Sequence, residues 1–474
     1  MMSKFVGALL LAASGLLAQA PSGPLVRLYP VAVDAGGQPV TDLTADDFKI
    51  VDQKPVPIFF FHKPGHETPP KPDLLEFSNR TSAVRRHTTV ILFDMINLTD
   101  ADRLENWKAL DKMFPQLESG DHLYFYVLNM EGTLIPIHKM GPKAADDQTW
   151  PQSAAAAFDK VMKSNSHARA LQIGAEEQQK RTLKAFEDLA NTLALFPGRR
   201  DILWVANGLT TVADPNLTNC TGDWVECDLY WPHLSVTLGR DGVAVDPYAL
   251  IGDLNADVNY NFVQMALLTG GHFYSRQDLK TVTSQVAQDA ANSYTILYDP
   301  GADNWNNKWH HLHVTSARSG VKLQLRERYY AAADSRTPIE RTKAVLMGAF
   351  QAPTDLAEVG LRVKLSPIEG KPGVLHLQIL IDPSDLLLRQ QQPNGKYTGA
   401  VYCLISDRSA SATLGEPTVL DLKPELTPEQ YKAALKEGLP LQQDRPIPDA
   451  ARMVRVILLD QNTDEVGSVT FPVK

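Results

Sequence analysis

The sequence has few cysteines, no excess of positive charge and no long apolar run beyond its first residues, and each absence narrows the range of functions. Three cysteines in 474 residues are too few for a disulfide-based scaffold. A formal net charge of −9 disfavours non-specific binding to nucleic acid, which requires a basic face. No later segment has the roughly 20 apolar residues that cross a bilayer. We therefore expect a folded mature chain with neither a nucleic-acid partner nor a transmembrane segment.

Catalytic motifs that can be recognised in a single sequence are also missing. The chain has no Gly-x-Ser-x-Gly elbow, no His-Glu-x-x-His helix and no phosphate-binding loop. Its acidic residues are too numerous to nominate a glycosidase pair. We expect a non-enzymatic protein, and the alternative is an unrecognised hydrolase whose site is assembled from distant residues.

The first residues have the pattern of an export signal. Lys4 provides a positive start, an apolar stretch follows from Phe5 to Leu17, and Ala18-Gln19-Ala20 is a small-x-small cleavage site. About thirteen apolar residues are too few to span a bilayer. The pattern predicts a signal peptide at residues 1–20 and a periplasmic or secreted mature protein.

Strand-like runs occur toward both ends of the chain and alternate with helices only in the middle. We expect an N-terminal β-segment and linker at residues 21–84, followed at residues 85–293 by a doubly wound, mostly parallel α/β domain. Residues 294–335 return to strands, and we expect them to complete one sandwich with the N-terminal strands, because neither block has enough strands alone. A linker at residues 336–354 then leads to a C-terminal β-sandwich at residues 355–474.

Two polar residues are expected at one edge of the α/β domain. The apolar and β-branched run from Thr89 to Phe93 is typical of a strand covered on both faces, and it ends at Asp94. A second such run, Ile202 to Val205, is followed closely by Asn207. Because the carboxyl ends of parallel strands lie at the same edge of a sheet, we expect Asp94 and Asn207 to lie near each other.

Short motifs spread over residues 25–335 suggest a family through their order and spacing. They are Val33 to Val40, Leu43 to Phe48, Leu92-Phe93-Asp94, Gly198 to Val205, Thr269-Gly270-Gly271, Tyr294 to Pro300 and Arg328-Tyr329-Tyr330. Together with the export signal, they resemble the VWFA-related domain family of acidobacterial exported proteins. The resemblance implies a Rossmann-like, von Willebrand factor type A domain that recognises other macromolecules.

The resemblance also implies a cation site, which this sequence only partly retains. Relatives place Asp-x-Ser-x-Ser after the first strand, with a Thr and an Asp on other loops. Here Ile96 and Leu98 replace both serines, and Asn207 takes the position of the later Asp. We expect a degenerate metal site of Asp94 and Asn207 with at most weak binding of Mg²⁺ or another divalent cation. In the alternative interpretation, Asp94 and Asn97 bond to local backbone donors.

The stretch from Leu209 to Leu254 reads as a long irregular loop at the same edge, and long loops in compact domains are often functional. We predict binding of a protein or glycan partner here. The candidate contact residues are Asn97, Thr99, Thr210, Trp224, Tyr230 and Trp231. The aromatic residues could equally pack the loop onto the domain. A structural or assembly module that acts through its β-domains is the alternative function.

Cysteines and histidines complete the set of candidate residues. Cys220 and Cys227 are expected to form a disulfide within the loop, with two inert thiols as the alternative. Cys403 is expected to be a buried thiol in a strand. The run from His310 to His313 could place two imidazoles on one strand face, but it lacks a third zinc ligand, so surface histidines are favoured.

Overall fold

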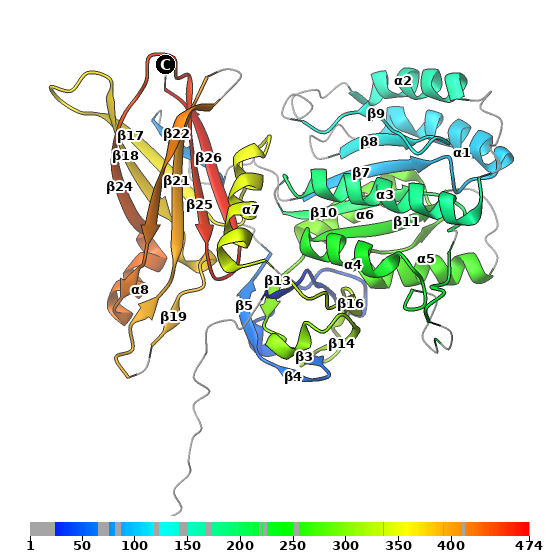
Figure 1. The fold of residues 1–474 in the computed structure, drawn as a ribbon, viewed down its shortest axis with the longest axis horizontal. Helices are drawn as coiled ribbons and strands as arrows, with labels where there is room; N and C mark the ends of the chain where they lie inside the picture. The colour runs from blue at the N-terminus through cyan, green and yellow to red at the C-terminus, as the bar shows by residue number, and fades with distance from the viewer. Residues whose placement is uncertain are drawn as a thin grey trace, which may run out of the picture.

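The computed structural model describes residues 24–64, 75–80, 87–117, 123–141, 150–165, 173–196, 198–209, 211–217, 220, 225–250, 256–334, 336–391, 393–409 and 413–473. It is a mixed α/β protein in which a mostly parallel sheet with helices adjoins several antiparallel β-sheets (Figure 1). The predicted signal peptide lies outside these residues. Within them, no helix combines the length and apolar character needed to cross a membrane.

The central sheet has the strand order of a doubly wound fold. Its six strands are β12 (Tyr274–Ser275), β11 (Val243–Ala249), β10 (Arg199–Val205), β7 (His87–Asp94), β8 (Leu123–Leu128) and β9 (Leu134–His138), in that order across the sheet. All neighbours are parallel except β9, which runs antiparallel to β8. Chain order reverses between β7 and β10, and the crevice at such a switch point is the usual ligand site of these folds.

Helices cover both faces of this sheet because successive strand residues point to opposite sides. Val90 and Leu92 enter the core beneath α3 (Ala175–Leu193), α4 (Trp231–Arg240) and α5 (Ala256–Thr269). Ile91 and Phe93 enter the core beneath α1 (Asp100–Met113), α2 (Trp150–Asn165) and α6 (Leu279–Ala291). The apolar run of β7 is therefore buried on both sides, as its composition predicted.

The stretch expected to be one long loop contains a helix and an interior strand of the sheet, which corrects that prediction. The residues described between Leu209 and Tyr230 belong to no helix or named strand, and α4 and β11 follow them. Both elements were missed for physical reasons. Asp246 and Pro247 lie inside β11, where a buried charge and a missing N–H argue against a strand. The helix α4 has only ten residues and begins next to a proline.

The N-terminal β-region is built from strands on both sides of the α/β domain. One sheet contains β1 (Val26–Leu28), β13 (Thr295–Tyr298) and β5 (Ile58–His62). A second sheet contains β16 (Arg328–Tyr330), β14 (Trp309–Ser316), β3 (Phe48–Asp52) and β4 (Lys54–Val56). In a third, β15 (Lys322–Gln324) pairs with β2 (Val31–Val33). All these pairings are antiparallel. Strands from before and after the α/β domain thus share one core.

The C-terminal region packs two antiparallel sheets around an aliphatic core. The first contains β24 (Leu439–Pro446), β18 (Val374–Ile381), β17 (Leu361–Pro367) and β6 (Glu76–Ser78); the second contains β22 (Thr413–Leu422), β21 (Val401–Arg408), β25 (Met453–Asp460) and β26 (Val466–Pro472). A small sheet of β19 (Arg389–Gln390), β20 (Tyr397–Thr398) and β23 (Glu425–Leu426) adjoins α8 (Pro428–Glu437). Cys403 lies buried in the core, as expected.

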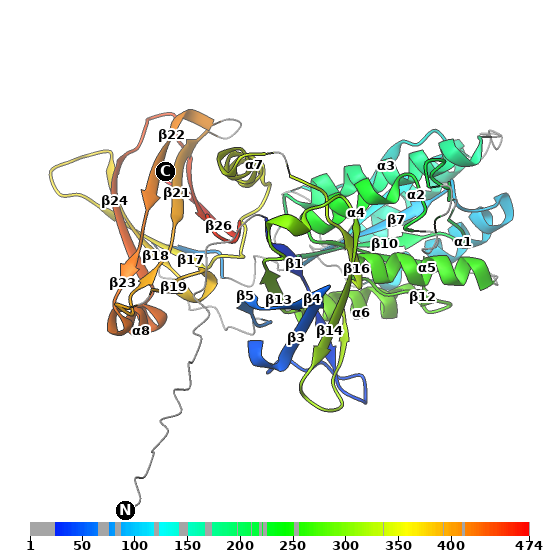
Figure 2. The same cartoon turned by 60° about the horizontal axis from the view of Figure 1, so that its bottom comes forward.

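Two segments near the predicted domain boundaries form regular structure. The strand β6 lies within residues 21–84, predicted as β-segment and linker, and it pairs with β17 of the C-terminal region. The helix α7 (Pro338–Gln351) occupies most of the expected second linker and begins with a capping box at Thr337 and Glu340. It lies between the C-terminal sheets and the α/β domain (Figures 1 and 2). Short 3-10 turns occur at Ala45–Asp47, Phe114–Gln116, Ala302–Asn304 and Pro383–Asp385.

Candidate functional site

The candidate site is the edge of the central sheet where β7 and β10 end. These parallel strands are in register up to the pair Phe93 and Val205, so the loops that follow them emerge together. The backbone N–H of Asn207 donates to the carbonyl oxygen of Asn97 at 3.3 Å, which joins the two loops directly. The structure therefore places Asp94, Asn97 and Asn207 on neighbouring loops at the same edge.

Asp94 is buried and accepts a full set of hydrogen bonds from the protein. Its Oδ1 accepts from the backbone N–H groups of Ile96 (2.8 Å) and Asn97 (3.2 Å). Its Oδ2 accepts from Asn97 Nδ2 (2.7 Å) and Trp204 Nε1 (2.9 Å). Burial raises the pKa of this carboxyl, and the hydrogen bonds from Asn97, Trp204 and Ile96 oppose the rise because they favour the ionised form.

This arrangement does not fit a divalent cation. An ionised carboxylate has about four acceptor positions, and N–H donors fill them around Asp94. Hard cations take oxygen ligands, whereas the atoms closest to this carboxylate are nitrogens that present hydrogen. In the described part of the chain, no three His, Cys, Asp or Glu side chains are grouped so that they could hold a metal. The contacts match the alternative interpretation, in which Asp94 organises its own loop.

Two of the predicted partner-contact residues, Asn97 and Thr99, make hydrogen bonds in and beside the loop that follows β7. Asn97 is 8% exposed, and its Nδ2 reaches both Asp94 and Thr182 Oγ1, the latter at 2.7 Å. Thr99 is exposed but serves as the N-cap of α1, because its side chain accepts the backbone N–H of Asp102 at 3.2 Å. Both side chains therefore stabilise this edge of the sheet through hydrogen bonds within the protein.

The first two turns of α3 hold the edge loops together, a role that the sequence analysis missed. Gln178 Nε2 donates to the carbonyl oxygen of Ile96 at 2.8 Å, in the loop after β7. Arg181 Nη1 donates to the carbonyl oxygen of Met130 at 2.6 Å, in the turn after β8. Gln179 Nε2 donates to Asp228 Oδ2 at 2.6 Å, in the loop after β10. One helix thus fixes three loops.

A signal for this role was present in the sequence. Gln179 and Thr182 are fully buried, and each lies four residues before an apolar core residue of α3, Leu183 and Phe186 respectively. Polar residues in the apolar phase of an amphipathic helix require partners inside the protein. The pattern indicates a polar contact beneath the helix, although it does not say which loop provides the partner.

The loop from Leu209 to Tyr230 is stapled to itself and tied to the β-region. Cys220 and Cys227 form a disulfide with a Cα–Cα separation of 5.7 Å. The neighbouring Glu226 accepts a hydrogen bond from Arg328 Nη1 at 3.0 Å and pairs with His311 Nε2 at 2.9 Å. Arg328 lies on β16 and His311 on β14. Because Glu226 is next to Cys227, the disulfide limits the freedom of the segment that makes these contacts.

The four predicted contact residues of this loop have different outcomes. Thr210 and Trp224 lie outside the described residues. Trp231 is fully buried in the core beneath α4, so its side chain has no surface to offer a partner. Tyr230 is partly exposed; its hydroxyl donates to Glu176 Oε1 at 2.7 Å, and Lys180 Nζ lies 5.6 Å from its ring centroid.

The histidine run has separate roles at each position. His310 is buried; its Nδ1 lies 2.8 Å from Asp52 Oδ1, and the hydroxyl groups of Tyr298 and Tyr329 also donate to Asp52. The expectation of surface histidines is therefore wrong for His310. His311 and His313 are exposed on one face of β14. The buried cluster is a set of polar contacts inside the β-region.

Comparison with known proteins gives no family for this chain. No family model matches it, and no curated protein matches it. Among solved structures, the human COPII-coat protein Sec24c matches at 9% identity over 63% of this chain and 54% of that one, with a TM-score of 0.28. A structure of β-glucosidase 3B from Thermotoga neapolitana with α-D-glucose matches at 11% identity over 84% and 52%, with a TM-score of 0.15. The chain spans about half the length of these proteins. At such TM-scores neither protein informs the function of this one.

Proposed function

We propose that the chain is an exported, non-enzymatic binding protein that recognises a protein or glycan at the carboxyl edge of its α/β domain. The domain is of the von Willebrand factor type A kind, with a degenerate metal site, and recognition at its edge does not use a cation. The order of the central strands supports this proposal, because the edge in question is the switch-point crevice of a doubly wound sheet.

The observation that carries the proposal is that protein contacts alone hold the edge together. Asp94 is satisfied by four N–H donors, and α3 is bonded to three separate loops. A surface whose loops are already ordered loses less conformational entropy when it binds a partner. Such pre-organisation favours recognition, and it makes the metal of the relatives unnecessary here.

Tyr230 and its neighbours are the best-placed contact residues on this surface. The tyrosine is partly exposed at the end of the disulfide loop. Beside it, Lys180 Nζ and Glu176 Oε1 form a salt bridge of 2.7 Å. A tyrosine beside charged groups offers a ring for packing and a hydroxyl for hydrogen bonding at low entropic cost. A protein or glycan surface can use both properties.

Export is part of the same proposal. The first residues have the pattern of a signal peptide, and the disulfide in the loop is a bond that persists in oxidising compartments outside the cytoplasm. The two features together support a periplasmic or secreted location. It is tested by the mass of the mature protein, which should begin after Ala20 when the chain is recovered from the exported fraction.

Capture experiments test the binding edge. Immobilised protein is incubated with the exported proteins and glycans of the producing cells, and captured partners are quantified with and without EDTA. We expect capture to survive EDTA and to fall at least tenfold in the double variant Tyr230→Ala with Lys180→Ala. The matched control is Tyr260→Ala with Lys163→Ala, since both of these residues are exposed on other helices.

A structural module acting through its β-sheets is the second candidate function. The strand β22 is the outer strand of its sheet, and Val419 on it is 53% exposed. Loss of capture in Val419→Asp, with full capture by the Tyr230 and Lys180 variant, would favour this second function. Turnover of peptide, ester or glycoside substrates by the purified protein would instead support the hydrolase alternative.

A further inference from the structure

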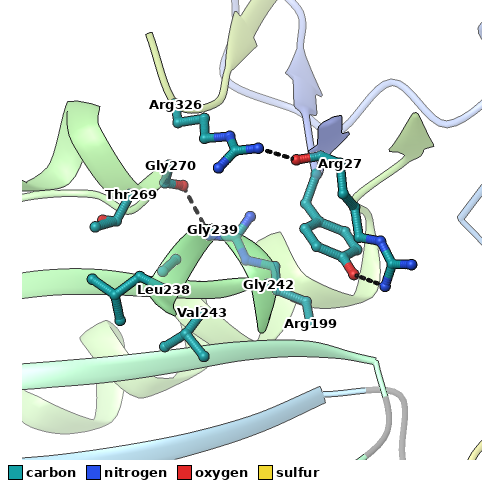
Figure 3. Close-up of a pocket in the computed structure, with 11 residues that line it drawn as sticks. Arg27, Arg199, Leu238, Gly239, Gly242, Val243, Thr269, Gly270 and Arg326 are labelled. Atoms are coloured by element: carbon teal, nitrogen blue, oxygen red, sulfur yellow. Dashed lines mark hydrogen bonds between the residues drawn. The ribbon is translucent and has the colours of Figure 1, made fainter. Parts of the chain in front are cut away.

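A second cavity lies at the opposite end of the central sheet, where β10 and β11 begin. It has a volume of about 30 Å³, is partly open to solvent, and is lined by residues of the α/β domain and of the β-region beside it (Figure 3). Three of its side chains are arginines from separate segments: Arg27 on β1, Arg199 on β10 and Arg326 between β15 and β16. The proposed function uses none of them.

Two of these guanidinium groups have nitrogen atoms that the surrounding protein leaves unused. Arg199 is 4% exposed; its Nε donates to Asp201 Oδ1 at 3.0 Å and its Nη2 to the carbonyl oxygen of Gly270 at 3.2 Å. Its buried Nη1 has no hydrogen-bond partner among the residues that the structure describes. The same holds, within those residues, for the buried Nε of Arg326. Figure 3 shows the two guanidinium groups pointing toward each other across the cavity.

Carboxylates of the described residues compensate the charges of Arg199 and Arg27 but not that of Arg326. Arg199 pairs with Asp201 at 3.0 Å, and the carboxyl groups of Asp246 and Asp289 also raise its pKa. Arg27 pairs with Glu465 at 3.2 Å. Arg326 donates to the backbone oxygen of Arg27 at 2.7 Å, and no carboxylate pairs with it among the described residues. Burial lowers the pKa of Arg326, and the charge of Arg27 acts in the same direction. An anion placed beside Arg326 would supply the counter-charge that this guanidinium group lacks, and the unused Nη1 of Arg199 would supply a second donor.

Glycines keep this cavity open. A Cβ at position 239 would lie 2.4 Å from Arg326 Nη1, and one at position 242 would lie 2.7 Å from Tyr29 Cε2. Gly242 also has a φ of +61°, which L side chains rarely adopt. With glycine at both positions, the side chains of Arg326 and Tyr29 reach the cavity between α4 and the β-region.

We infer that this cavity binds a carboxylate between Arg199 and Arg326. A volume of about 30 Å³ holds roughly two water-sized atoms, which is the size of the two oxygens of one carboxylate. A guanidinium group presents its N–H donors in a plane that matches carboxylate oxygens. The ligand is a small organic acid or the terminal carboxylate of a peptide, which have the same recognised group.

The first test compares acetate with acetamide, its neutral counterpart of similar shape, at constant ionic strength. Binding to the full chain is measured by calorimetry and by the shift of the unfolding temperature. We expect acetate to bind and acetamide to bind at least tenfold more weakly. Arg326→Gln should weaken acetate binding at least tenfold, and Arg318→Gln, which removes a partly exposed arginine of the same β-region, should leave it unchanged.

A second measurement on the unmodified protein covers the case in which Arg326→Gln fails to fold. Phenylglyoxal reacts with accessible arginines, and mass spectrometry reports the modified positions. Acetate should slow modification of Arg326 at least threefold, whereas modification of Arg318 should not change. Equal effects of acetate and acetamide, or binding of chloride or phosphate in preference to acetate, would overturn the assignment.

The two sources of the carboxylate are separated by a third comparison. A short peptide with a free C-terminus and its amidated form are titrated beside acetate. Tighter binding of the free-acid peptide than of acetate identifies a chain terminus as the ligand, and equal affinity identifies a small organic acid. Because the cavity lies far from Tyr230, the capture test and this test fail independently.

Discussion

At the scale of single residues, Asp94 at the end of β7 organises the loop that follows it. In the resembled family this aspartate is expected to hold a cation, but here its lone pairs are taken by the protein. Asn97 makes the difference, because its amide nitrogen bonds both Asp94 and Thr182. The Asn97 amide thus occupies one acceptor position of the carboxylate and links it to α3.

Replacing Asp94 should therefore destabilise the fold strongly. Asp94→Ala leaves four donors without an acceptor in a buried place, and we expect a loss of about 3–5 kcal/mol in the free energy of unfolding. Urea denaturation followed by tryptophan fluorescence measures it. Asp111→Ala, at an exposed position of α1, should cost less than about 0.5 kcal/mol.

Titration of the native protein and of Asp94→Asn with divalent cations tests whether Asp94 can hold a metal ion. We expect Mg²⁺, Mn²⁺ and Ca²⁺ to leave the unfolding temperature of the native protein unchanged, because no acceptor position on Asp94 is open to them. An increase in unfolding temperature with Mg²⁺ that disappears in Asp94→Asn would contradict the geometry argued above.

At the scale of elements, β6 is the clearest case of structure decided by distant partners. Its three residues follow a segment rich in proline, and nothing local marks them as a strand. They form one because β17 presents an open edge for antiparallel pairing. Asn79 directly after β6 strengthens the junction, since its side chain bonds the backbone at Leu356, Val359 and Leu361.

Removing the Asn79 side chain tests this junction. Asn79→Ala leaves two carbonyl oxygens and one N–H without their bonds of 2.7–2.8 Å, and we expect a loss of about 3 kcal/mol in stability. Hydrogen exchange should increase first in β17 and its neighbours. Asn216→Ala, at an exposed loop position, is the matched control and should change neither quantity. A variant as stable as the wild type would show that β6 is not held by this side chain.

At the scale of the whole molecule, charged groups join the three regions. Arg200 of β10 donates to Glu358 at 3.3 Å, and Arg27 of β1 pairs with Glu465, which precedes β26. Burial raises the pKa of Glu465 to about 7; Arg27 opposes the rise and Glu358 adds to it. The junction between the N-terminal and C-terminal regions therefore contains a carboxyl that titrates near neutral pH.

Stability should depend on pH through this group. Because the folded-state pKa of Glu465 exceeds its ordinary value of 4.5, the folded state binds the proton more tightly, and this contribution decreases as pH rises from 4.5 through 7. It amounts to about 3 kcal/mol. Glu465→Gln mimics the protonated side chain, so the variant should gain stability relative to the wild type between pH 5 and pH 8. Unfolding temperatures that stay parallel over this range would refute the assignment.

The sequence alone determined the local parts of this protein. Buried strands such as β7 were predicted because a continuous apolar run is stable only with cover on both faces. The mixed α/β architecture, with a mostly parallel sheet and antiparallel β-regions, was predicted from alternation of the two periodicities and is confirmed by the strand order. The position of Asp94 at the carboxyl edge of the sheet was predicted from the direction of the parallel strands.

Only the tertiary structure decided the features that depend on partners distant in sequence. The strand β11 contains Asp246 and Pro247, and β6 is three residues long, so both exist because neighbouring strands complete them. The four donors on Asp94 come from residues up to 110 positions away, and local pattern cannot reveal such a set. Hydrogen bonds and ion pairs form between groups that lie a few ångströms apart in space. Because folding brings such groups together from distant parts of the sequence, only the tertiary structure identifies the partners.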